Sequence, residues 1–193
     1  MMRGHIGRWR PLRHAAMISA VTASPELSAV DQIRAVANRY CRGVDRLDSE
    51  IMKSAYWPDA VDDHGVYVGN AHVFCDRVVS SHTRFLATMH CIFNHHIEFD
   101  GPDMAHGEIY NVTYLHRRDT EDAQKVFVDT WWGRYLDRYE RRAAPEGYAW
   151  RIAHRVCVHE WTTSSEIQTS MPIAADRFRQ GSHDRGTELA LGT

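Results

Sequence analysis

The sequence predicts a single α+β domain, in which three N-terminal helices pack on a strongly curved, mixed and mainly antiparallel sheet to form a cone-shaped α+β barrel. Apolar residues in the first half of the chain recur at spacings of three and four, which is the period of an amphipathic helix. The second half contains long runs of β-type residues separated by turn residues. Helices followed by such a sheet are typical of the α+β class.

The size and charge of the chain narrow its class. The 193 residues, 44% of them hydrophobic, suit one domain with a sizeable core. The 23 basic and 25 acidic residues give a formal net charge of -2, which provides no strong field for nucleic acid or an anionic membrane. We therefore expect a small-molecule partner, no nucleic acid and no membrane. The four cysteines are scattered without a CxxC pair, which is typical of reduced thiols in a cytoplasmic protein.

The two ends of the chain differ from its middle. Residues 1–23 contain arginines but no acid, and their apolar run is too short and too polar to span a bilayer. We expect a disordered extension, or a true start at Met17, in preference to a signal peptide. Residues 164–193 are polar and contain several glycines, which predicts a tail. The folded domain is expected over residues 24–163.

Three helices are predicted in the first half. Ser24-Pro25-Glu26 offers an N-cap, a proline at the first helical position and an early acid, so the first helix is expected to begin there. A second short helix is expected over residues 48–56, and a third over residues 71–86. Residues 59–68 predict a short strand pair or loop between them. The apolar stripe of the first helix comprises Ile33, Val36, Ala37, Tyr40, Cys41 and Val44.

Two hairpins are predicted in the second half. Residues 90–99 lead through an Asp-Gly-Pro-Asp turn into residues 104–116. Residues 126–140 and 148–161 flank a second turn that contains proline and glycine. These four runs supply the long strands of the sheet.

Asp45 and His90 are the candidate catalytic pair. Asp45 closes the apolar stripe of the first helix, and His90 opens the first long strand. If they meet in the fold, His90 is a general base whose tautomer Asp45 fixes. A neutral imidazole with an ordinary pKa of about 6.5 accepts a proton at pH 7, which typically contributes roughly 10²- to 10⁴-fold to a rate. Tyr40 can donate a hydrogen bond to the substrate, and Arg155 can stabilise developing negative charge.

The same residues also have ordinary structural interpretations. An aspartate at the edge of an apolar helix face is usually a boundary residue, and a histidine on a strand is usually hydrogen-bonded without a catalytic role. Tyr40 can simply belong to the core. Arg155 can pair across the sheet with Asp129, Asp137 or Glu160.

No metal or cofactor is expected. Histidines are numerous, but they form no HxH or HExxH ligand pattern, and the chain contains no CxxC. Adjacent His95 and His96 point to opposite faces of a strand. The nucleotide-binding patterns GxGxxG and GxxxxGK are absent as well.

Five segments, taken in order and spacing, resemble the SnoaL-like family of the nuclear transport factor two-like superfamily. The resemblance covers about residues 26–163, and its closest pattern is that of bile acid dehydratase and hexachlorocyclohexane dehydrochlorinase. It implies a cone-shaped barrel whose open end holds an apolar ligand pocket. The segments are RYCRGVDRLD, YWPDAVDDHG, MHCIFNHHIEF, GRYLDRYERR and WRIAHRVCVHEW.

The resemblance also assigns candidate roles residue by residue. Tyr40 and Asp45 match the first-helix tyrosine and aspartate of bile acid dehydratase. His90 matches the histidine that opens the first long strand in both enzymes. Arg155 matches the final-strand arginine of the dehydrochlorinase. These matches imply catalytic roles for all four residues.

The expected substrate pocket is apolar with a few polar groups. Glu108 is the nearest counterpart of a further pocket acid in bile acid dehydratase, and Asn111 is another candidate. Alternation along the final strand places Cys157 and His159 on the face of Arg155. The expected pocket residues are Trp57, Phe85, Glu108, Asn111, Trp131, Cys157 and His159.

These features predict a cofactor-independent lyase of dehydratase or dehydrohalogenase type. His90 would take a proton from carbon while water or another group leaves the adjacent carbon of a small apolar or polycyclic substrate. The alternatives are an isomerase that resembles ketosteroid isomerase, and a non-catalytic module that binds a small molecule or resembles a dioxygenase small subunit. The resemblance also implies a homodimer or homotrimer, for which the exposed face of a curved sheet supplies a contact surface.

Overall fold

The computed structural model describes residues 28–168. The expected extension at residues 1–23, the predicted helix start at residues 24–26, and residues 169–193 of the expected tail lie outside this part of the chain. The elements are, in chain order, α2 (Ala29–Arg46), α3 (Ser49–Lys53), β1 (Tyr56–Asp63), β2 (Val68–Asn70), α4 (Ala71–His82), β3 (Ala87–Phe99), β4 (Met104–Arg118), β5 (Val126–Ala144) and β6 (Gly147–Glu166).

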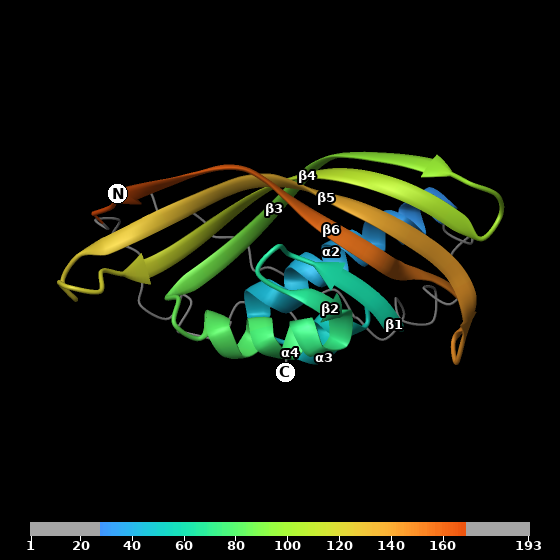
Figure 1. Ribbon diagram of the computed structural model, residues 1–193, viewed down its shortest axis with the longest axis horizontal. Coiled ribbons are helices and arrows are strands. Elements are labelled where there is room, and N and C mark those ends of the chain that lie inside the picture. Colours follow the sequence, from blue (N-terminus) through green and yellow to red (C-terminus); the bar gives the residue numbers. More distant parts are fainter. Residues whose placement is uncertain (1–27, 169–193) are drawn as a thin grey trace, which may run out of the picture.

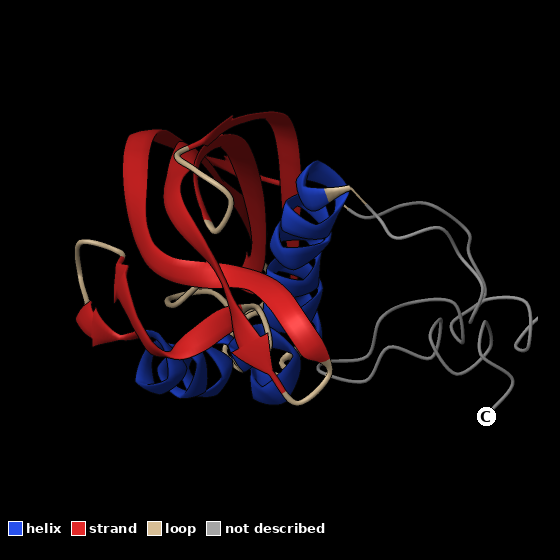
Figure 2. Cartoon of the chain, turned by 90° about the vertical axis from the view of Figure 1, so that its right-hand side faces the viewer, coloured by secondary structure: helices blue, strands red, loops and turns tan. Residues whose placement is uncertain are grey.

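The strands form one six-stranded sheet in the order β2-β1-β6-β5-β4-β3. β1 runs parallel to β6, and every other neighbouring pair is antiparallel. The three helices cover one face of the sheet (Figure 1), and the sheet curls over them into an open cone (Figure 2). The predicted α+β class, with three helices on a curved, mixed and mainly antiparallel sheet, is therefore confirmed.

Local sequence signals set the ends of the helices. Ser28 caps α2 because its hydroxyl accepts a hydrogen bond from the backbone N–H of Asp31 at 3.2 Å. Asp48 caps α3 in the same way through the backbone N–H of Ile51 at 2.9 Å. α3 ends at Lys53, earlier than predicted, because the chain then enters β1.

Both predicted hairpins are present, and their strands are longer than expected. α4 ends at His82, and residues 83–86 form a turn before β3 begins, so the third helix is shorter than predicted. β6 continues past the expected domain boundary at residue 163. There the hydroxyl of Ser164 donates to a carboxylate oxygen of Asp129 on β5 at 2.6 Å, which holds the two strands together.

The curvature of the sheet coincides with irregular strand pairing. One register shift lies between Ile92 and His95 of β3, and two more follow Trp132 and Arg138 of β5. Bulges of this kind bend a strand and increase its twist. They help the long strands to curl over the helices instead of forming a flat layer.

The core lies between α2 and the inner face of the sheet. Close packing also joins α2 to α3, because a Cβ added to Gly43 would lie 2.6 Å from the backbone nitrogen of Met52. None of the helices in residues 28–168 is both long enough and apolar enough to span a membrane. The predicted stripe of α2 is buried in full, with Ile33, Val36, Ala37, Tyr40, Cys41 and Val44 all in the core.

Candidate active site

The structure brings Asp45 and His90 together where the last turn of α2 meets the start of β3. Asp45 Oδ1 accepts a hydrogen bond from His90 Nδ1 at 2.7 Å, and Asp45 Oδ2 accepts one from the backbone N–H of His90 at 2.9 Å. The hydroxyl of Thr88 donates to Asp45 Oδ1 at 3.1 Å. The side chains of His90 and Asp45 are only 8% and 12% exposed. Three donors therefore fix the carboxylate, and the carboxylate fixes the imidazole.

This arrangement determines which nitrogen of His90 can react. A neutral imidazole that donates its Nδ1 proton to Asp45 has a free lone pair on Nε2. That nitrogen can accept a proton, and the adjacent carboxylate stabilises the imidazolium that results. The pair thus has the geometry of a general base and its orienting group, with a hydrogen-bond distance inside the usual range.

His90 lines a cavity of about 210 Å³ between the sheet and the helices. The cavity mixes apolar side chains with several histidines. Three of the expected pocket residues, Trp131, Cys157 and His159, line it with His90. The complete lining is His64, His82, His90, Thr113, Leu115, Trp131, Tyr135, Cys157 and His159.

Burial holds His82, Tyr135 and Cys157 of the cavity lining in their neutral forms near pH 7. Burial, aided by the proximity of His90 and Arg84, lowers the pKa of His82 to about 4. Burial also raises the pKa of the Cys157 thiol to about 12, so this thiol is not a nucleophile near pH 7. His159 is engaged through Nε2 with the Thr162 hydroxyl at 2.7 Å.

Arg155 and Tyr40 lie deeper than the cavity. Arg155 and Asp137 form a fully buried ion pair, in which Nε and Nη2 each donate to a carboxylate oxygen at 2.7 Å. Asp137 is one of the three carboxylates that sequence analysis offered as a structural partner. The guanidinium carbon also lies 4.3 Å from the ring centre of Tyr40 and 4.0 Å from that of Tyr135. Tyr135 lines the cavity, so this buried cluster supports its inner surface.

Within this cluster the phenol of Tyr40 is neutral, and the guanidinium of Arg155 is charged. Burial raises the pKa of Tyr40 well above its usual range, so its phenol stays neutral. Burial acts in the opposite direction on Arg155, but the charge of Asp137 raises the pKa of the guanidinium well above its usual range. The phenol of Tyr139 donates to the same carboxylate at 2.7 Å. Arg155 Nη1 has no hydrogen-bond partner among the described residues.

Three of the expected pocket residues, Trp57, Phe85 and Asn111, do not line this cavity. The indole N–H of Trp57 donates to the backbone carbonyl of residue 140 at 2.9 Å. Phe85 follows α4, with its ring 5.2 Å from that of His82. Asn111 is buried beside Thr113, whose hydroxyl donates to Asn111 Oδ1 at 3.1 Å. Asn111 Nδ2 has no partner among the described residues, which leaves a buried donor close to the cavity.

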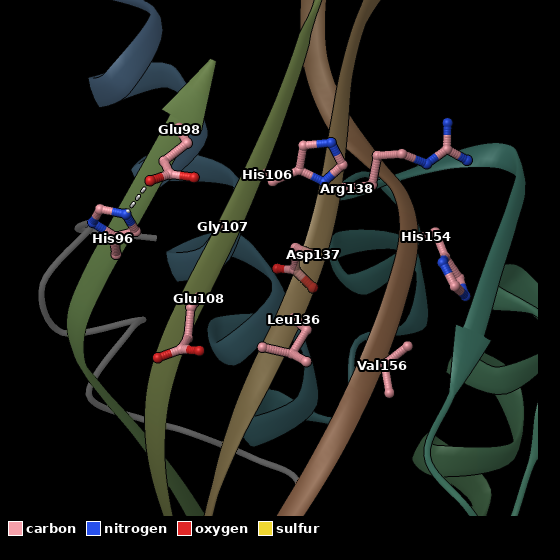
Figure 3. Close-up of a pocket in the computed structure, with 10 residues that line it drawn as sticks. All are labelled: His96, Glu98, His106, Gly107, Glu108, Leu136, Asp137, Arg138, His154 and Val156. Atoms are coloured by element: carbon pink, nitrogen blue, oxygen red, sulfur yellow. Dashed lines mark hydrogen bonds and ion pairs between the residues drawn. The ribbon is translucent and has the colours of Figure 1, made fainter. Parts of the chain in front are cut away.

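Glu108 lies on the opposite, outer face of the sheet. Figure 3 shows it among the residues that line a hollow of about 440 Å³ across β3, β4, β5 and β6. Glu108 pairs there with Arg134 at 3.0 Å. This hollow is larger than the inner cavity, but its one histidine–carboxylate contact, His96 with Glu98, joins side chains that are 71% and 76% exposed. Water competes with such a contact, so the inner cavity is the stronger candidate site.

Sequence analysis did not single out His64 and Asp62. His64 lines the inner cavity, and its Nδ1 is hydrogen-bonded to Asp62. The two residues are separated by one position, and side chains at such a spacing share one face of a strand. That spacing was a usable signal. Within residues 28–168, no group of three or more histidine, cysteine, aspartate or glutamate residues is placed to hold a metal ion.

Residues 25–156 match the model of the SnoaL-like domain. The chain belongs to the SnoaL-like family. The resemblance of the sequence segments to this family, within the nuclear transport factor two-like superfamily, is therefore confirmed. No curated protein matches the sequence of this SnoaL-like domain.

Solved structures share the fold of this SnoaL-like domain at low sequence identity. A protein from Novosphingobium aromaticivorans, provisionally assigned as a scytalone dehydratase, is 16% identical with a TM-score of 0.59, over 81% of this chain and 97% of its own. A type-3 hexachlorocyclohexane dehydrochlorinase from Novosphingobium barchaimii is 17% identical with a TM-score of 0.57, over 82% of this chain and 100% of its own. A Mycobacterium tuberculosis protein of unknown function is 20% identical with a TM-score of 0.55, over 77% of this chain and 78% of its own.

Proposed function

We propose that this protein is a cofactor-independent lyase, in which His90 removes a proton from carbon and a group leaves the adjacent carbon. The observation that carries the proposal is the short hydrogen bond between His90 Nδ1 and Asp45, 2.7 Å, at the lining of an inner cavity. The fold that it shares with a dehydrochlorinase and with a protein assigned as a dehydratase supports the same reaction class.

In the proposed step, His90 Nε2 accepts the proton from carbon. The electrons of the broken C–H bond form a carbon–carbon double bond, and the leaving group departs with the electrons of its own bond. Asp45 stabilises the imidazolium while it exists. Tyr40 and Arg155 contribute by supporting Tyr135 instead of touching the substrate.

The cavity indicates the size of the substrate. Its volume of about 210 Å³ lies below the roughly 300–1,000 Å³ of pockets for drug-sized ligands. Leu115, Trp131 and Tyr135 give it apolar surface. We infer a compact ring compound as substrate, in preference to a larger polycyclic one such as a steroid.

Two probe compounds test the reaction class. One is 3-hydroxy-1-tetralone, a β-hydroxy ketone whose loss of water gives fluorescent 1-naphthol, and the other is hexachlorocyclohexane, whose loss of HCl is followed as chloride. We expect the wild type to turn over at least one of them. His90→Gln and Asp45→Asn should lower kcat by about 10²-fold or more, given the usual contribution of a general base.

The control is His106→Gln, because His106 lies in the outer hollow and away from the inner cavity. It should keep wild-type turnover, and circular dichroism should show that all variants remain folded. A wild type that binds both probes without turnover would indicate a binding module. Deuterium incorporation without loss of the leaving group would indicate an isomerase.

We further infer that the outer sheet face contacts a second copy of the chain in a homodimer. Phe93, Tyr110 and Trp161 are exposed there around a hollow of about 550 Å³. Arg134 bridges Glu108 and Glu160 on the same face, at 3.0 and 2.7 Å, so the face carries both signs of charge and can meet an identical face without net repulsion.

Trp161→Glu tests this contact, because it places a charge at the centre of the apolar surface. Sedimentation velocity should show a dimer for the wild type and a monomer for the variant. A trimer would support contact between copies with a different symmetry, and a monomeric wild type would refute it.

The four free thiols, Cys41, Cys75, Cys91 and Cys157, support a reducing, cytoplasmic setting.

A further inference from the structure

A second histidine–carboxylate pair faces the same cavity. Asp62 is the penultimate residue of β1, is fully buried, and pairs in register with Arg155 of the parallel neighbour β6. His64 follows the strand, and its Nδ1 is hydrogen-bonded to Asp62 Oδ1. The other oxygen of Asp62 accepts a hydrogen bond from the phenol of Tyr56 at 2.7 Å. Asp62 is therefore held from two sides, as Asp45 is.

The ring of His64 is also fixed by packing. It stacks on the ring of Phe74 of α4, with centroids 4.2 Å apart and an angle of 24° between the planes. Its centroid lies 6.2 Å from that of Tyr135, which lines the cavity. The backbone N–H of His64 donates to the carbonyl of Tyr67 at 2.9 Å and so closes the turn between β1 and β2. Contacts from α4, β5 and the turn thus determine where Nε2 can lie.

Four histidines line the cavity, and two of them are backed by a carboxylate among the described residues. These are His64 and His90. His82 is kept neutral by burial, and His159 is engaged with a threonine hydroxyl. A hydrogen bond from Nδ1 to a carboxylate leaves Nε2 as the reactive nitrogen in both pairs. The cavity therefore presents two imidazoles prepared for proton transfer.

The topology places these imidazoles at opposite sides of the cavity. His90 stands on β3, an edge strand of the sheet, whereas Asp62 stands on β1, toward the other edge, in the order β2-β1-β6-β5-β4-β3. Figure 2 shows that the sheet curls, and both histidines line the same cavity. A substrate between them meets one histidine on each side, which suits removal of a proton and departure of a group from opposite faces of the substrate.

We propose that His64, positioned by Asp62, is the general acid that protonates the leaving group. This inference rests on the proposed lyase function. His90 Nε2 takes the proton from carbon, and the C–H electrons form the double bond. The C–O bond breaks toward oxygen, which takes a proton from His64 Nε2 and leaves as water. His64 becomes neutral, His90 becomes an imidazolium, and exchange with solvent restores both.

The surroundings of the two carboxylates explain this division of roles. Asp45 shares its charge among three donors, two of them from His90 and one from Thr88. Asp62 accepts from His64 and from one neutral phenol, so more of its charge is available to a protonated imidazole. We therefore assign the protonated, donating role to His64 and the accepting role to His90.

A general acid identifies the class of the substrate. Hydroxide is a poor leaving group and needs a proton to depart, whereas a halide leaves as a stable anion. The second pair therefore assigns an alcohol as substrate, most simply a compact cyclic β-hydroxy ketone. In such a ketone the carbonyl group acidifies the proton that His90 removes from the adjacent carbon. Loss of water is expected to be faster than loss of halide.

The experiment separates the acid from the base. We would measure dehydration of 3-hydroxy-1-tetralone and, separately, deuterium exchange at C2 of 1-tetralone, which has no leaving group. His64→Gln should lower kcat for dehydration by about 10²-fold or more but leave exchange at the wild-type rate. Asp62→Asn should act in the same direction, and His90→Gln should abolish both reactions. His106→Gln, at a histidine of the outer hollow, is the control and should change neither.

The pH profile provides a readout that a purely structural role would not move. The wild-type rate of dehydration should fall at high pH, where the acid is lost, and His64→Gln should remove that fall. His82, Tyr135 and Cys157, which also line the cavity from α4, β5 and β6, do not change charge near neutrality. Burial lowers the pKa of His82 to about 4, raises that of Tyr135 well above its usual range, and raises that of Cys157 to about 12.

Three results would overturn the inference. One is a His64→Gln variant that loses no more dehydration than His106→Gln, and another is equal loss of exchange and dehydration. The third is faster release of chloride from hexachlorocyclohexane than dehydration of the ketone by the wild type. A wild type inactive in exchange, dehydration and chloride release would overturn the proposed function itself. Independently of substrate, downfield proton NMR should show two protected imidazole protons, one absent in His64→Gln and the other in His90→Gln.

Discussion

The buried pair of Arg155 and Asp137 gives the sharpest prediction about stability. Both side chains are 0% exposed, and two hydrogen bonds of 2.7 Å join them. Asp137→Asn keeps the shape but removes the charge, so the guanidinium stays buried without its partner. Breaking one side of a buried pair costs roughly 3–5 kcal/mol. Since a domain is usually stable by about 5–15 kcal/mol, we expect a large fall in the free energy of unfolding.

Asp129 offers a matched control on the same strand. It also accepts two hydrogen bonds from an arginine, Arg117, at 2.6 and 3.1 Å, but the two side chains are 23% and 29% exposed. Asp129→Asn should therefore cost about 1 kcal/mol or less. Urea unfolding followed by tryptophan fluorescence measures both losses, and equal losses would refute the argument from burial. Asp137→Leu combined with Arg155→Met should be more stable than Asp137→Asn alone, because it leaves no unpaired charge.

Two further predictions concern packing and pH. Gly43→Ala should lower stability by roughly 1–3 kcal/mol, because the added methyl would lie 2.6 Å from the backbone nitrogen of Met52, and a raised melting temperature would contradict this packing. Burial lowers the pKa of His82 from 6.5 to about 4, so the unfolded chain binds this proton first as the pH falls. The free energy of unfolding should therefore decrease as the pH falls from about 6.5 to about 4. His82→Gln should make this decrease smaller. If urea titrations of His82→Gln show the same dependence of the free energy of unfolding on pH as the wild type, His82 does not contribute.

Much of the fold was within reach of the sequence, because its helices and strands carry strong periodic patterns. Asp45 and His90 stand at the ends of two such elements, so their contact could be anticipated. Glu108 shows how alternation limits a pocket prediction: it lies three positions from Asn111, and residues at an odd spacing on a strand face opposite sides. The structure accordingly has Glu108 on the outer face and Asn111 inside.

The contacts that sequence analysis left open depend on register between distant strands. Arg155 had three possible partners, and the pairing of β5 with β6 places Asp137 directly opposite it. The position of His64 depends on the parallel pairing of β1 with β6 and on packing against Phe74 of α4. Composition and periodicity carry no information about such long-range register, although the spacing of Asp62 at the end of β1 and His64 just after it was visible in the sequence.

The irregular pairing of β3 with β4 and of β5 with β6 has a consequence for how this site can change. Because the two histidine–carboxylate pairs stand near opposite ends of the sheet, the distance between them depends on how sharply the strands between them bend. Insertion or deletion of one residue at a bulge alters that bend without replacing any residue that transfers a proton. The size of molecule that the cavity admits and the reaction that it catalyses can therefore evolve separately.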